Sequence, residues 1–298
     1  MLMVKYSEIL LKRRATRSIL ERMLGGNIRA ALGGSEFRMN REGGVFFIEA
    51  DDEKRCAENL RRIFGIVYIS VCEVVPADMD KIVEKCVDMG KGFGKGSSFA
   101  IRARRWGEHS FSSSDIGVKA GAAVLDGLRS KKLKVDLGEP DEEIFVDVRM
   151  KKAYISRNRI KAYGGMPLGC QGKVVAVISD MDSYNAAWMM MRRGCGIVAI
   201  CNSRRGVRIA EKLREWHIGR KMRVHDLSSK RAKIPKEKLF KEAGRVSRES
   251  GALGVVSGES LCKHRKLAEM AKLDAAAGVP VYRPLVLLRE KEVKMVMG

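Results

Sequence analysis

The chain has 298 residues, 45% of them hydrophobic and 32% charged, with a formal net charge of +22 at pH 7. This is the composition of a soluble globular protein with room for two or three domains, and no apolar run approaches the ~20 residues that a membrane-spanning helix needs. The positive charge favours a polyanionic partner, nucleic acid above a membrane surface, and the lack of a secretory pattern at the start leads us to expect a cytoplasmic protein.

The first elements predict a small α+β unit. Residues 1–11 have the pattern of a strand, and residues 15–32 have that of an amphipathic helix. A hairpin over residues 38–50, a helix over 52–64 and a strand over 65–75 follow. This βαββαβ order is typical of a ferredoxin-like unit.

A second α+β unit follows in the sequence. We predict a helix over residues 78–89, a strand over 97–104 and a helix capped by serine and aspartate over 114–128. A hairpin over residues 144–149 and 153–157 completes this unit.

Residues 101–119 combine basic and aromatic side chains. Guanidinium groups bind phosphates through paired hydrogen bonds, and aromatic or imidazole rings stack on unpaired bases. Arg102 and Arg104 share one face if the segment is a strand. We therefore predict an RNA-binding patch, against the alternative of a basic edge that only keeps the protein soluble. The candidate RNA-binding residues are Arg102, Arg104, Arg105, Trp106, His109, Phe111 and Lys119.

The pattern changes after the Gly/Pro-rich segment 163–169, which we interpret as the boundary to a C-terminal domain. Beyond it apolar strands alternate with helices, which predicts an open parallel sheet with helices on both faces. Ligands of such sheets bind at the carboxyl ends of the strands. The expected strands are residues 174–178, 196–200, 223–227, 253–256 and 279–282.

Residues 174–184 have the strand and turn of a phosphate-binding site but lack its glycines. The strand reaches Ser179, and a helix is expected from Asn185. Glycine lets a loop backbone approach a phosphate closely, whereas Asp180 places a carboxylate there. Two like charges ~4 Å apart at an effective dielectric constant of ~20 repel by ~4 kcal/mol, which would weaken phosphate binding several hundredfold.

Cysteine and histidine patterns give no metal site. The seven cysteines form no C-x-x-C pair and the four histidines have no metal-like spacing. Cys195 and Cys262 are candidate reactive thiols because cationic residues lie near them in the sequence. His217 and His225 are candidates for a general base.

Three segments resemble the tRNA 4-thiouridine sulfurtransferases, a family also associated with thiamine biosynthesis. Residues 103–117 (A-R-R-W-G-E-H-S-F-S-S-S-D-I-G) resemble the core of the RNA-binding THUMP domain. Residues 163–179 (Y-G-G-M-P-L-G-C-Q-G-K-V-V-A-V-I-S) look like the family's linker and first C-terminal strand, and residues 255–261 (V-V-S-G-E-S-L) are similar to its second nucleotide motif. Residues 3–11 and 283–285 extend the likeness over nearly the whole chain, in family order.

The resemblance implies an α+β part followed by an α/β part. Its domains would be an N-terminal ferredoxin-like domain at residues 1–53, a THUMP domain at 54–158, a linker at 159–170 and a parallel-sheet PP-loop domain at 171–298. The last domain would use ATP to activate a uridine of tRNA before sulfur replaces its oxygen. The implied nucleotide-binding residues are Val177, Ile178, Ser179, Ser183, Lys236 and Gly258, with Asp182 at the catalytic position.

The sequence departs from the family where nucleotide would bind. The family's S-G-G-x-D-S loop is one residue shorter here, residues 179–183, and residues 262–267 replace the family's Gly-Gln continuation. The sequence also ends at Gly298, before the region of the family's sulfur-relay cysteine, so we expect no relay domain.

Two hypotheses stay open. The first is a tRNA-binding protein of this family whose ATP loop is degenerate and which uses no cofactor. The second is an active ATP-dependent uridine thiolation enzyme, with Mg²⁺ held by Asp180 and Asp182 and sulfur supplied by a separate persulfide donor protein. A second copy of the chain is a further candidate partner. The alternative function that involves no RNA is that of an enzyme of thiamine synthesis acting on a small molecule.

Overall fold

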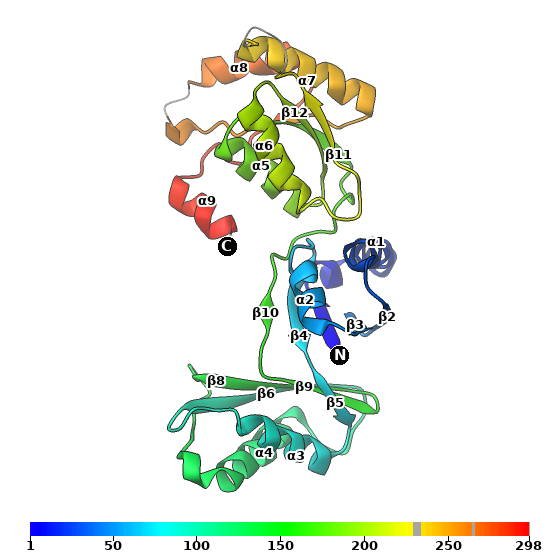
Figure 1. The fold of residues 1–298 in the computed structure, drawn as a ribbon, viewed down its shortest axis with the longest axis vertical. Coiled ribbons are helices and arrows are strands. Elements are labelled where there is room, and N and C mark those ends of the chain that lie inside the picture. Colours follow the sequence, from blue (N-terminus) through cyan, green and yellow to red (C-terminus); the bar gives the residue numbers. More distant parts are fainter. Residues whose placement is uncertain (229–233, 264–265, 298) are drawn as a thin grey trace. The chain divides into compact units, whose positions relative to one another are not determined.

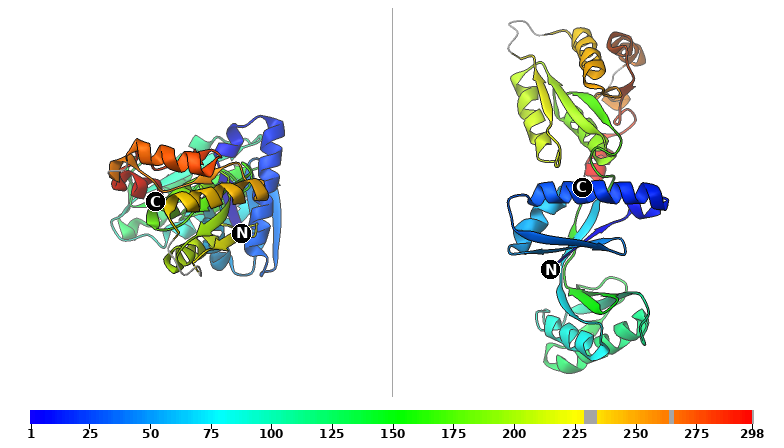
Figure 2. Two further views of the ribbon diagram at one scale, coloured as in Figure 1. Left: turned by 90° about the horizontal axis from the view of Figure 1, so that it is seen from above. Right: turned by 90° about the vertical axis from the view of Figure 1, so that its right-hand side faces the viewer.

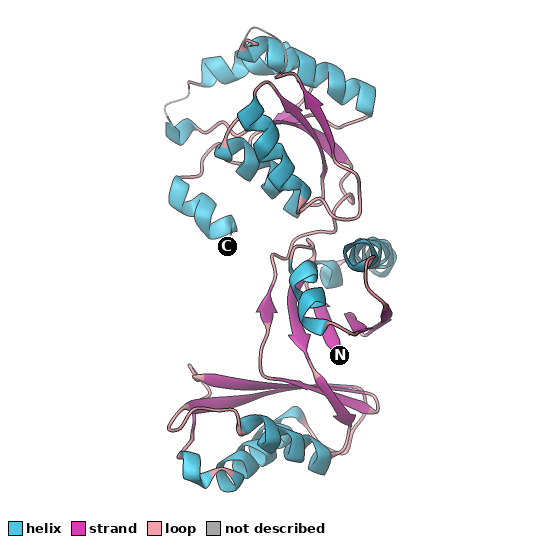
Figure 3. Ribbon diagram, viewed as in Figure 1, coloured by secondary structure: helices cyan, strands magenta, loops and turns pink. Residues whose placement is uncertain are grey.

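The computed structural model describes residues 1–228, 234–263 and 266–297. The chain divides into two compact units, the first made of Met1–Val4, Phe37–Ala57 and Tyr68–Lys161, and the second of the remaining segments. Strands of the described residues form three sheets of five strands each, and helices alternate with the strands along the chain (Figures 1 and 3). None of the described helices has the length and apolarity needed to cross a bilayer.

The N-terminal elements follow the predicted βαββαβ order, and the prediction of a ferredoxin-like unit is confirmed. They are β1 (Leu2–Tyr6), α1 (Arg14–Leu32), β2 (Phe37–Glu42), β3 (Val45–Ala50), α2 (Glu53–Arg61) and β4 (Ile66–Val71). The sheet has the order β10-β4-β1-β3-β2, with β10 at Ile160–Lys161. The predicted first strand is too long, because Glu8–Leu11 forms a 3-10 turn in which only Ile9 is buried.

The second α+β unit predicted from the sequence lies within the first compact unit and is built on a sheet of order β5-β9-β8-β6-β7, with two helices on one face (Figure 1). Its elements are β5 (Glu73–Pro76), α3 (Met79–Gly90), β6 (Ser98–Trp106), α4 (Ser113–Gly127), a 3-10 turn (Arg129–Lys131), β7 (Lys134–Val135), β8 (Glu142–Arg149) and β9 (Lys152–Ser156). The strand predicted over residues 65–75 is wrong as a single element. It is two strands, β4 and β5, which belong to different sheets and meet at buried Cys72.

Alternation along β6 decides which of its side chains are exposed. Ile101 and Ala103 pack on the apolar core beneath α3 and α4. Since successive side chains of a strand point to opposite faces, Arg102 and Arg104 lie on the face away from the helices. The sequence prediction that these two arginines share a face is confirmed.

The C-terminal domain has a parallel sheet of order β13-β12-β11-β14-β15, as predicted. Its elements are β11 (Lys173–Val177), α5 (Met181–Arg192), β12 (Gly196–Cys201), α6 (Arg204–Arg214), β13 (Arg223–Asp226), α7 (Lys236–Ser250), β14 (Val255–Val256), a 3-10 turn (Leu261–Lys263), α8 (Leu267–Ala277), β15 (Val281–Tyr282) and α9 (Glu290–Met297). Helices cover both faces of the sheet (Figures 1 and 2).

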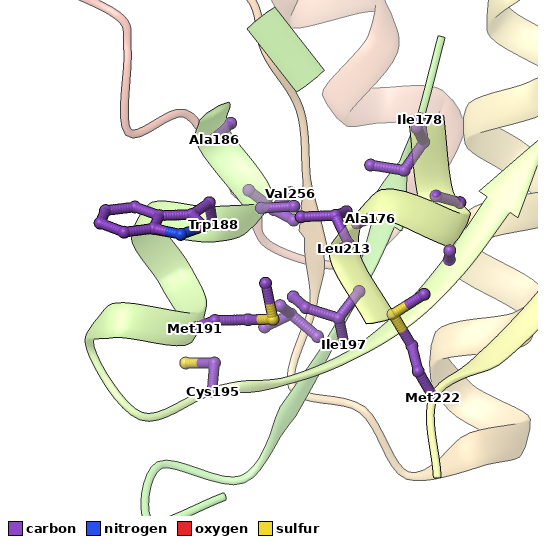
Figure 4. Packing of buried hydrophobic residues seen from close by; sticks show 14 of the residues in the cluster. Ala176, Ile178, Ala186, Trp188, Met191, Cys195, Ile197, Leu213, Met222 and Val256 are labelled. Carbon is purple, nitrogen blue, oxygen red and sulfur yellow. The ribbon is translucent and has the colours of Figure 1, made fainter. Parts of the chain in front are cut away.

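Two apolar clusters flank this sheet. Val174, Ala176 and Ile178 point to the cluster formed with α5 and α6, whereas Val175 and Val177 point to the cluster formed with α7 and α8. Trp188 is fully buried in the first cluster (Figure 4). Burying a large apolar side chain stabilises a fold by ~1.5–3 kcal/mol, so the strand is held firmly on both sides.

Candidate functional site

The loop after β11 lies where the strand order of the parallel sheet reverses. From the central strand β11 the chain continues to β12 on one side, and β14 pairs with β11 on the other. Loops at the carboxyl ends of β11 and β14 therefore flank a crevice, the usual ligand position in this architecture. The loop after β11 is the segment from Ser179 to Ser183.

Asp180 caps the helix that follows this loop. Its Oδ1 accepts a hydrogen bond of 2.9 Å from the backbone N–H of Ser183, and its Oδ2 accepts one of 3.1 Å from the Ser179 hydroxyl. The Ser183 hydroxyl accepts in return from the backbone N–H groups of Ser179 and Asp180, at 2.9 and 3.0 Å. This reciprocal capping starts α5 at Met181 rather than at the predicted Asn185.

The cap uses the groups that an anion would need. Helix N-termini bind phosphate through free backbone N–H groups. Here the N–H groups of Ser179, Asp180 and Ser183 donate to side chains of the loop itself. In this arrangement three backbone N–H groups of the loop are already engaged by side chains of the loop itself.

A pocket of about 160 Å³ adjoins the capped loop. It is smaller than the ~300–1,000 Å³ of typical small-molecule sites. Its lining includes most of the predicted nucleotide-binding residues: Val177, Ser179, Ser183, Lys236 and Gly258, together with Asp182. Ile178 is not brought to the pocket; it is fully buried, and its N–H donates to the carbonyl of Ile200 at 3.0 Å. The binding and catalytic roles of these residues stay predictions.

Glu259 joins three segments at this pocket. It forms ion pairs with Lys236 and, at 2.8 Å, with Arg283, which also pairs with Asp274 at 2.7 Å. Burial raises the pKa of Glu259, but hydrogen bonds from Lys236 and Arg283 outweigh it and hold that pKa below its usual value. Glu259 is therefore an anion at neutral pH, and the ammonium of Lys236 already has a carboxylate partner.

Sequence reasoning named Glu259 and Arg283 as parts of motifs but gave neither a role. The contact between Glu259 and Arg283 could have been predicted from the adjacency of β14 and β15, which pair in parallel. Loops that follow neighbouring parallel strands lie side by side, so a Glu three residues after β14 and an Arg directly after β15 come together.

Gly258 allows the β14 loop to approach the start of α5. A Cβ at this position would lie 2.3 Å from the backbone N of Ser183 and 2.7 Å from the carbonyl oxygen of Asp182. Both neighbours are backbone atoms that cannot turn aside. The close approach therefore requires glycine.

The described residues do not form a site that would hold a metal ion with protein side chains alone. No group of three or more His, Cys, Asp or Glu side chains that could hold one occurs in residues 1–228, 234–263 and 266–297. Both Asp180 oxygens accept hydrogen bonds from the loop. Mg²⁺ binding by Asp180 and Asp182 gains no support from this arrangement.

The face of the THUMP-like sheet opposite its helices carries part of the predicted RNA-binding patch. Arg102 forms an ion pair of 2.7 Å with Glu143, whereas Arg104 is exposed. Trp106 ends the strand with 49% of its surface exposed, and a Cβ at Gly43 of the β2–β3 turn would lie 3.7 Å from its ring. Arg104 and Trp106 thus offer a cation and a ring on one face.

The other predicted RNA-binding residues lie beyond the end of β6. The guanidinium of Arg105 donates to the carbonyl of His109 at 3.2 Å, and the His109 ring stacks on Phe111 at 5.5 Å between centroids. Phe111 packs against the core beneath the helices, so it anchors the loop. Lys119 is exposed on α4.

Arg159 joins the same sheet face, although it was not among the predicted RNA-binding residues. Its guanidinium carbon lies 3.5 Å from the centroid of Phe145 and 4.6 Å from that of Tyr68. Phe145 pairs with Arg102 across β6 and β8. Burial, and to a smaller extent Arg104, lowers the pKa of Arg159 from its ordinary value. Arginine at this spot lies between aromatic rings, a pattern that spacing along the chain does not reveal.

Two of the candidate reactive residues, Cys195 and His217, lose support. Burial raises the pKa of Cys195, which disfavours its thiolate. His217 is buried and accepts a hydrogen bond at Nε2 from the backbone N–H of Ile197, at 2.9 Å, so it has a structural role. Cys262 is exposed beside the pocket loop, and His264 lies outside the described residues.

Family models match most of the chain in the predicted order. Residues 1–70 match the ThiI ferredoxin-like domain, residues 76–158 the THUMP domain, and residues 169–217 the Thiamine biosynthesis protein (ThiI) family. The resemblance found in the sequence is thereby confirmed.

Relatives and solved structures agree with the models. Probable tRNA sulfurtransferases of Methanosarcina mazei and Thermococcus kodakarensis are 34% and 32% identical to this chain. Each alignment covers 97% of this chain, and it covers 80% of the first relative and 84% of the second. A Pyrococcus horikoshii protein superposes with a TM-score of 0.83 at 28% identity, over 99% of this chain and 97% of its own. A 4-thiouridine synthetase bound to RNA and ATP superposes with a TM-score of 0.80 at 26% identity, over 99% and 83%. The chain belongs to the tRNA sulfurtransferase family, with a ferredoxin-like domain, a THUMP domain and a parallel-sheet domain consistent with the PP-loop class.

Proposed function

We propose that this protein binds tRNA through its THUMP sheet face while its own Asp180 carboxylate occupies the phosphate position of the PP-loop domain. Adenylation by this chain is then impaired, and the protein either holds tRNA without modifying it or works with a second protein. The observation that carries the proposal is the hydrogen bond from the Ser183 N–H to Asp180 Oδ1.

Charge adds to this blockage. A phosphate entering the loop would lose the N–H donors and would meet a carboxylate of the same sign. The full repulsion of two unit charges at ~4 Å is ~4 kcal/mol, but Asp180 is exposed and solvent screens it. We take about 1–2 kcal/mol as the screened value, which weakens nucleotide binding roughly tenfold.

Support for tRNA as the partner comes from the exposed cation and ring of the THUMP face. Arg104 and Trp106 can contact a phosphate and a base, and the net charge of +22 attracts a polyanion over a distance. One similar structure is that of a 4-thiouridine synthetase bound to RNA. An RNA bound here would therefore lose affinity when the charge of this face is removed.

Filter binding with tRNA tests the RNA half of the proposal. The double variant Arg104→Gln/Trp106→Ala should weaken tRNA binding at least tenfold, because one phosphate contact and one stacking contact are each worth ~1–3 kcal/mol. The matched control is Arg129→Gln/Phe37→Ala, which alters a paired arginine and a ring outside this face. Equal effects of the two double variants would refute RNA binding at the face.

An active enzyme is the second candidate, and one observation favours it. Ser179, Asp182, Ser183, Lys236 and Gly258 all line one pocket, as a working nucleotide site would require. Under this alternative ATP binding would break the Asp180 cap, and sulfur would come from a separate persulfide donor. Transfer of sulfur to tRNA in the presence of ATP, Mg²⁺ and a persulfidated donor protein would establish it. A homodimer, a cytoplasmic location and a role in thiamine synthesis stay predictions.

A further inference from the structure

A second cavity lies at the amino ends of the C-terminal strands, the edge opposite the Asp180 loop. It measures about 520 Å³, within the ~300–1,000 Å³ range of small-molecule sites. Lys173, Gly196 and Arg223, the first residues of β11, β12 and β13, all line it. The loop that corresponds to the family's nucleotide loop lies at the opposite edge of the sheet and does not line this cavity.

The lining of this amino-edge cavity is strongly basic. It contains the exposed side chains of Lys173, Arg220, Lys221 and Arg223 and no aspartate or glutamate. Carboxylates of nearby segments are engaged elsewhere, since Glu215 pairs with Arg62 and Glu249 with Arg245. The cavity therefore has positive charges that the described residues do not neutralise.

Helix dipoles account for only part of this charge. Helix α7 ends at Ser250 on the cavity wall, and the C-terminus of α6 is at the same edge because helices and strands alternate in direction. Each helix end carries the equivalent of about −0.5 charge. By the same alternation α5 and α8 also end at this edge, so four such ends offset about two of the four cations and leave a surplus of about two positive charges for a ligand.

Arg220, one of these basic groups, is held in place. His217 Nδ1 donates to the carbonyl of Arg220 at 3.0 Å, while Nε2 accepts from the Ile197 N–H, so the segment is fixed to β12. The guanidinium of Arg220 lies against Gly169, where a Cβ would be 2.4 Å from its Nε. A site with prepositioned cations loses less entropy on binding than a flexible surface does.

The cavity also has an apolar side. Leu253 is 61% exposed, and Ile197, Val198 and three glycines complete the lining. A ligand with a phosphate group and a planar ring would match both the basic and the apolar side of the cavity. The guanidinium groups would bind the phosphate, and Leu253 would pack against the ring. We infer that the amino-edge cavity binds a nucleotide through its phosphate.

Two sources supply this chemistry: a free mononucleotide and an unpaired nucleotide of an RNA strand. Only the second rests on the proposed tRNA binding. Fluorescence anisotropy on the full chain with labelled AMP and with a labelled oligouridine of about eight nucleotides separates them. The test variant is Arg220→Gln/Arg223→Gln, and the control is Lys241→Gln/Lys272→Gln, which removes the same charge from exposed positions on α7 and α8.

The test variant should weaken binding of at least one probe tenfold or more, because charge-assisted hydrogen bonds contribute ~1.5–3 kcal/mol each. The control should change it less than about twofold, since it leaves the cavity intact. Leu253→Glu, at an exposed position, should weaken the same probe without unfolding the protein. Loss of the AMP signal alone identifies a free nucleotide as ligand, and loss of the oligouridine signal identifies RNA.

Two results would overturn the inference. One is that the test and control variants bind both probes with equal affinity. The same conclusion follows if neither probe binds the unmodified protein with a dissociation constant below about 1 mM. The other is AMP binding that is lost in Lys236→Gln but kept in Arg220→Gln/Arg223→Gln, which assigns the nucleotide to the Asp180 pocket. Failure of tRNA binding at the THUMP face leaves the AMP measurement decisive, so the two proposals fail separately.

Discussion

Arg102 and Arg104 share a face of β6 but differ in their partners. Arg102 must break its 2.7 Å ion pair with Glu143 before it can bind a phosphate, whereas no carboxylate of the described residues forms an ion pair with Arg104. We expect Arg104→Gln to weaken tRNA binding about five- to tenfold and to reduce the salt slope by about one phosphate contact. Arg102→Gln should weaken tRNA binding less than about threefold. Filter binding at several salt concentrations compares the two variants, and a larger loss in Arg102→Gln would contradict the assignment.

His217 makes stability depend on pH. Burial disfavours the charged imidazolium and lowers the pKa of His217 below its ordinary value of 6.5. Protonation of Nε2 would also break the bond from the Ile197 N–H. The unfolded chain then takes up the proton more readily, so the contribution of His217 is complete above pH 6.5 and is lost as the pH falls below it. Urea unfolding at pH 8.0 and 5.0 should show a larger decrease for the wild type than for His217→Gln, by up to ~1.4 kcal/mol per pH unit. Equal decreases would show that another group causes the acid dependence.

At the scale of elements, the approach of the β14 loop to α5 depends on one glycine. In Gly258→Ala the new Cβ would overlap backbone atoms of Asp182 and Ser183, so we expect a loss of about 2–3 kcal/mol in the free energy of unfolding. The control is Gly26→Ala, at an exposed position in α1 with no atom within 4 Å of the added Cβ. That change should stabilise the protein by up to ~1 kcal/mol. Urea unfolding measures both, and an unchanged Gly258→Ala would show that the loop can move apart.

The sequence predicted the elements well where apolar periodicity is long, as in α1 and in β11 and β12. It missed the start of α5, because the cap comes from hydrogen bonds between Asp180 and Ser183 and not from an apolar pattern. It also missed the division at Cys72, since an unbroken apolar run does not show that its halves enter different sheets. The Glu259–Arg283 contact could be expected only once β14 is known to pair with β15, and the Arg159–Phe145 contact only once the sheet face of each side chain is known.

At the scale of the whole molecule, the charge of +22 predicts how RNA binding responds to salt. Each neutralised phosphate releases counterions, and about six contacts would give a slope near −5 in a plot of the logarithm of the association constant against that of salt concentration. Filter binding of tRNA between 50 and 200 mM salt measures this slope, with a neutral polymer as the control. An association constant that does not change with salt concentration would contradict electrostatic binding of RNA.

The central claim is that the Asp180 carboxylate fills the phosphate position, and isothermal titration with ATP and Mg²⁺ tests it most directly. The matched control for Asp180→Gly is Asp78→Gly, which removes the N-cap carboxylate of α3 instead. Glycine at an N-cap costs only a few tenths of a kcal/mol, so both variants should fold. We expect no saturable binding below about 1 mM for the wild type and Asp78→Gly, and binding at least tenfold tighter for Asp180→Gly. Micromolar binding by the wild type that Asp180→Gly leaves unchanged or weakens would contradict it.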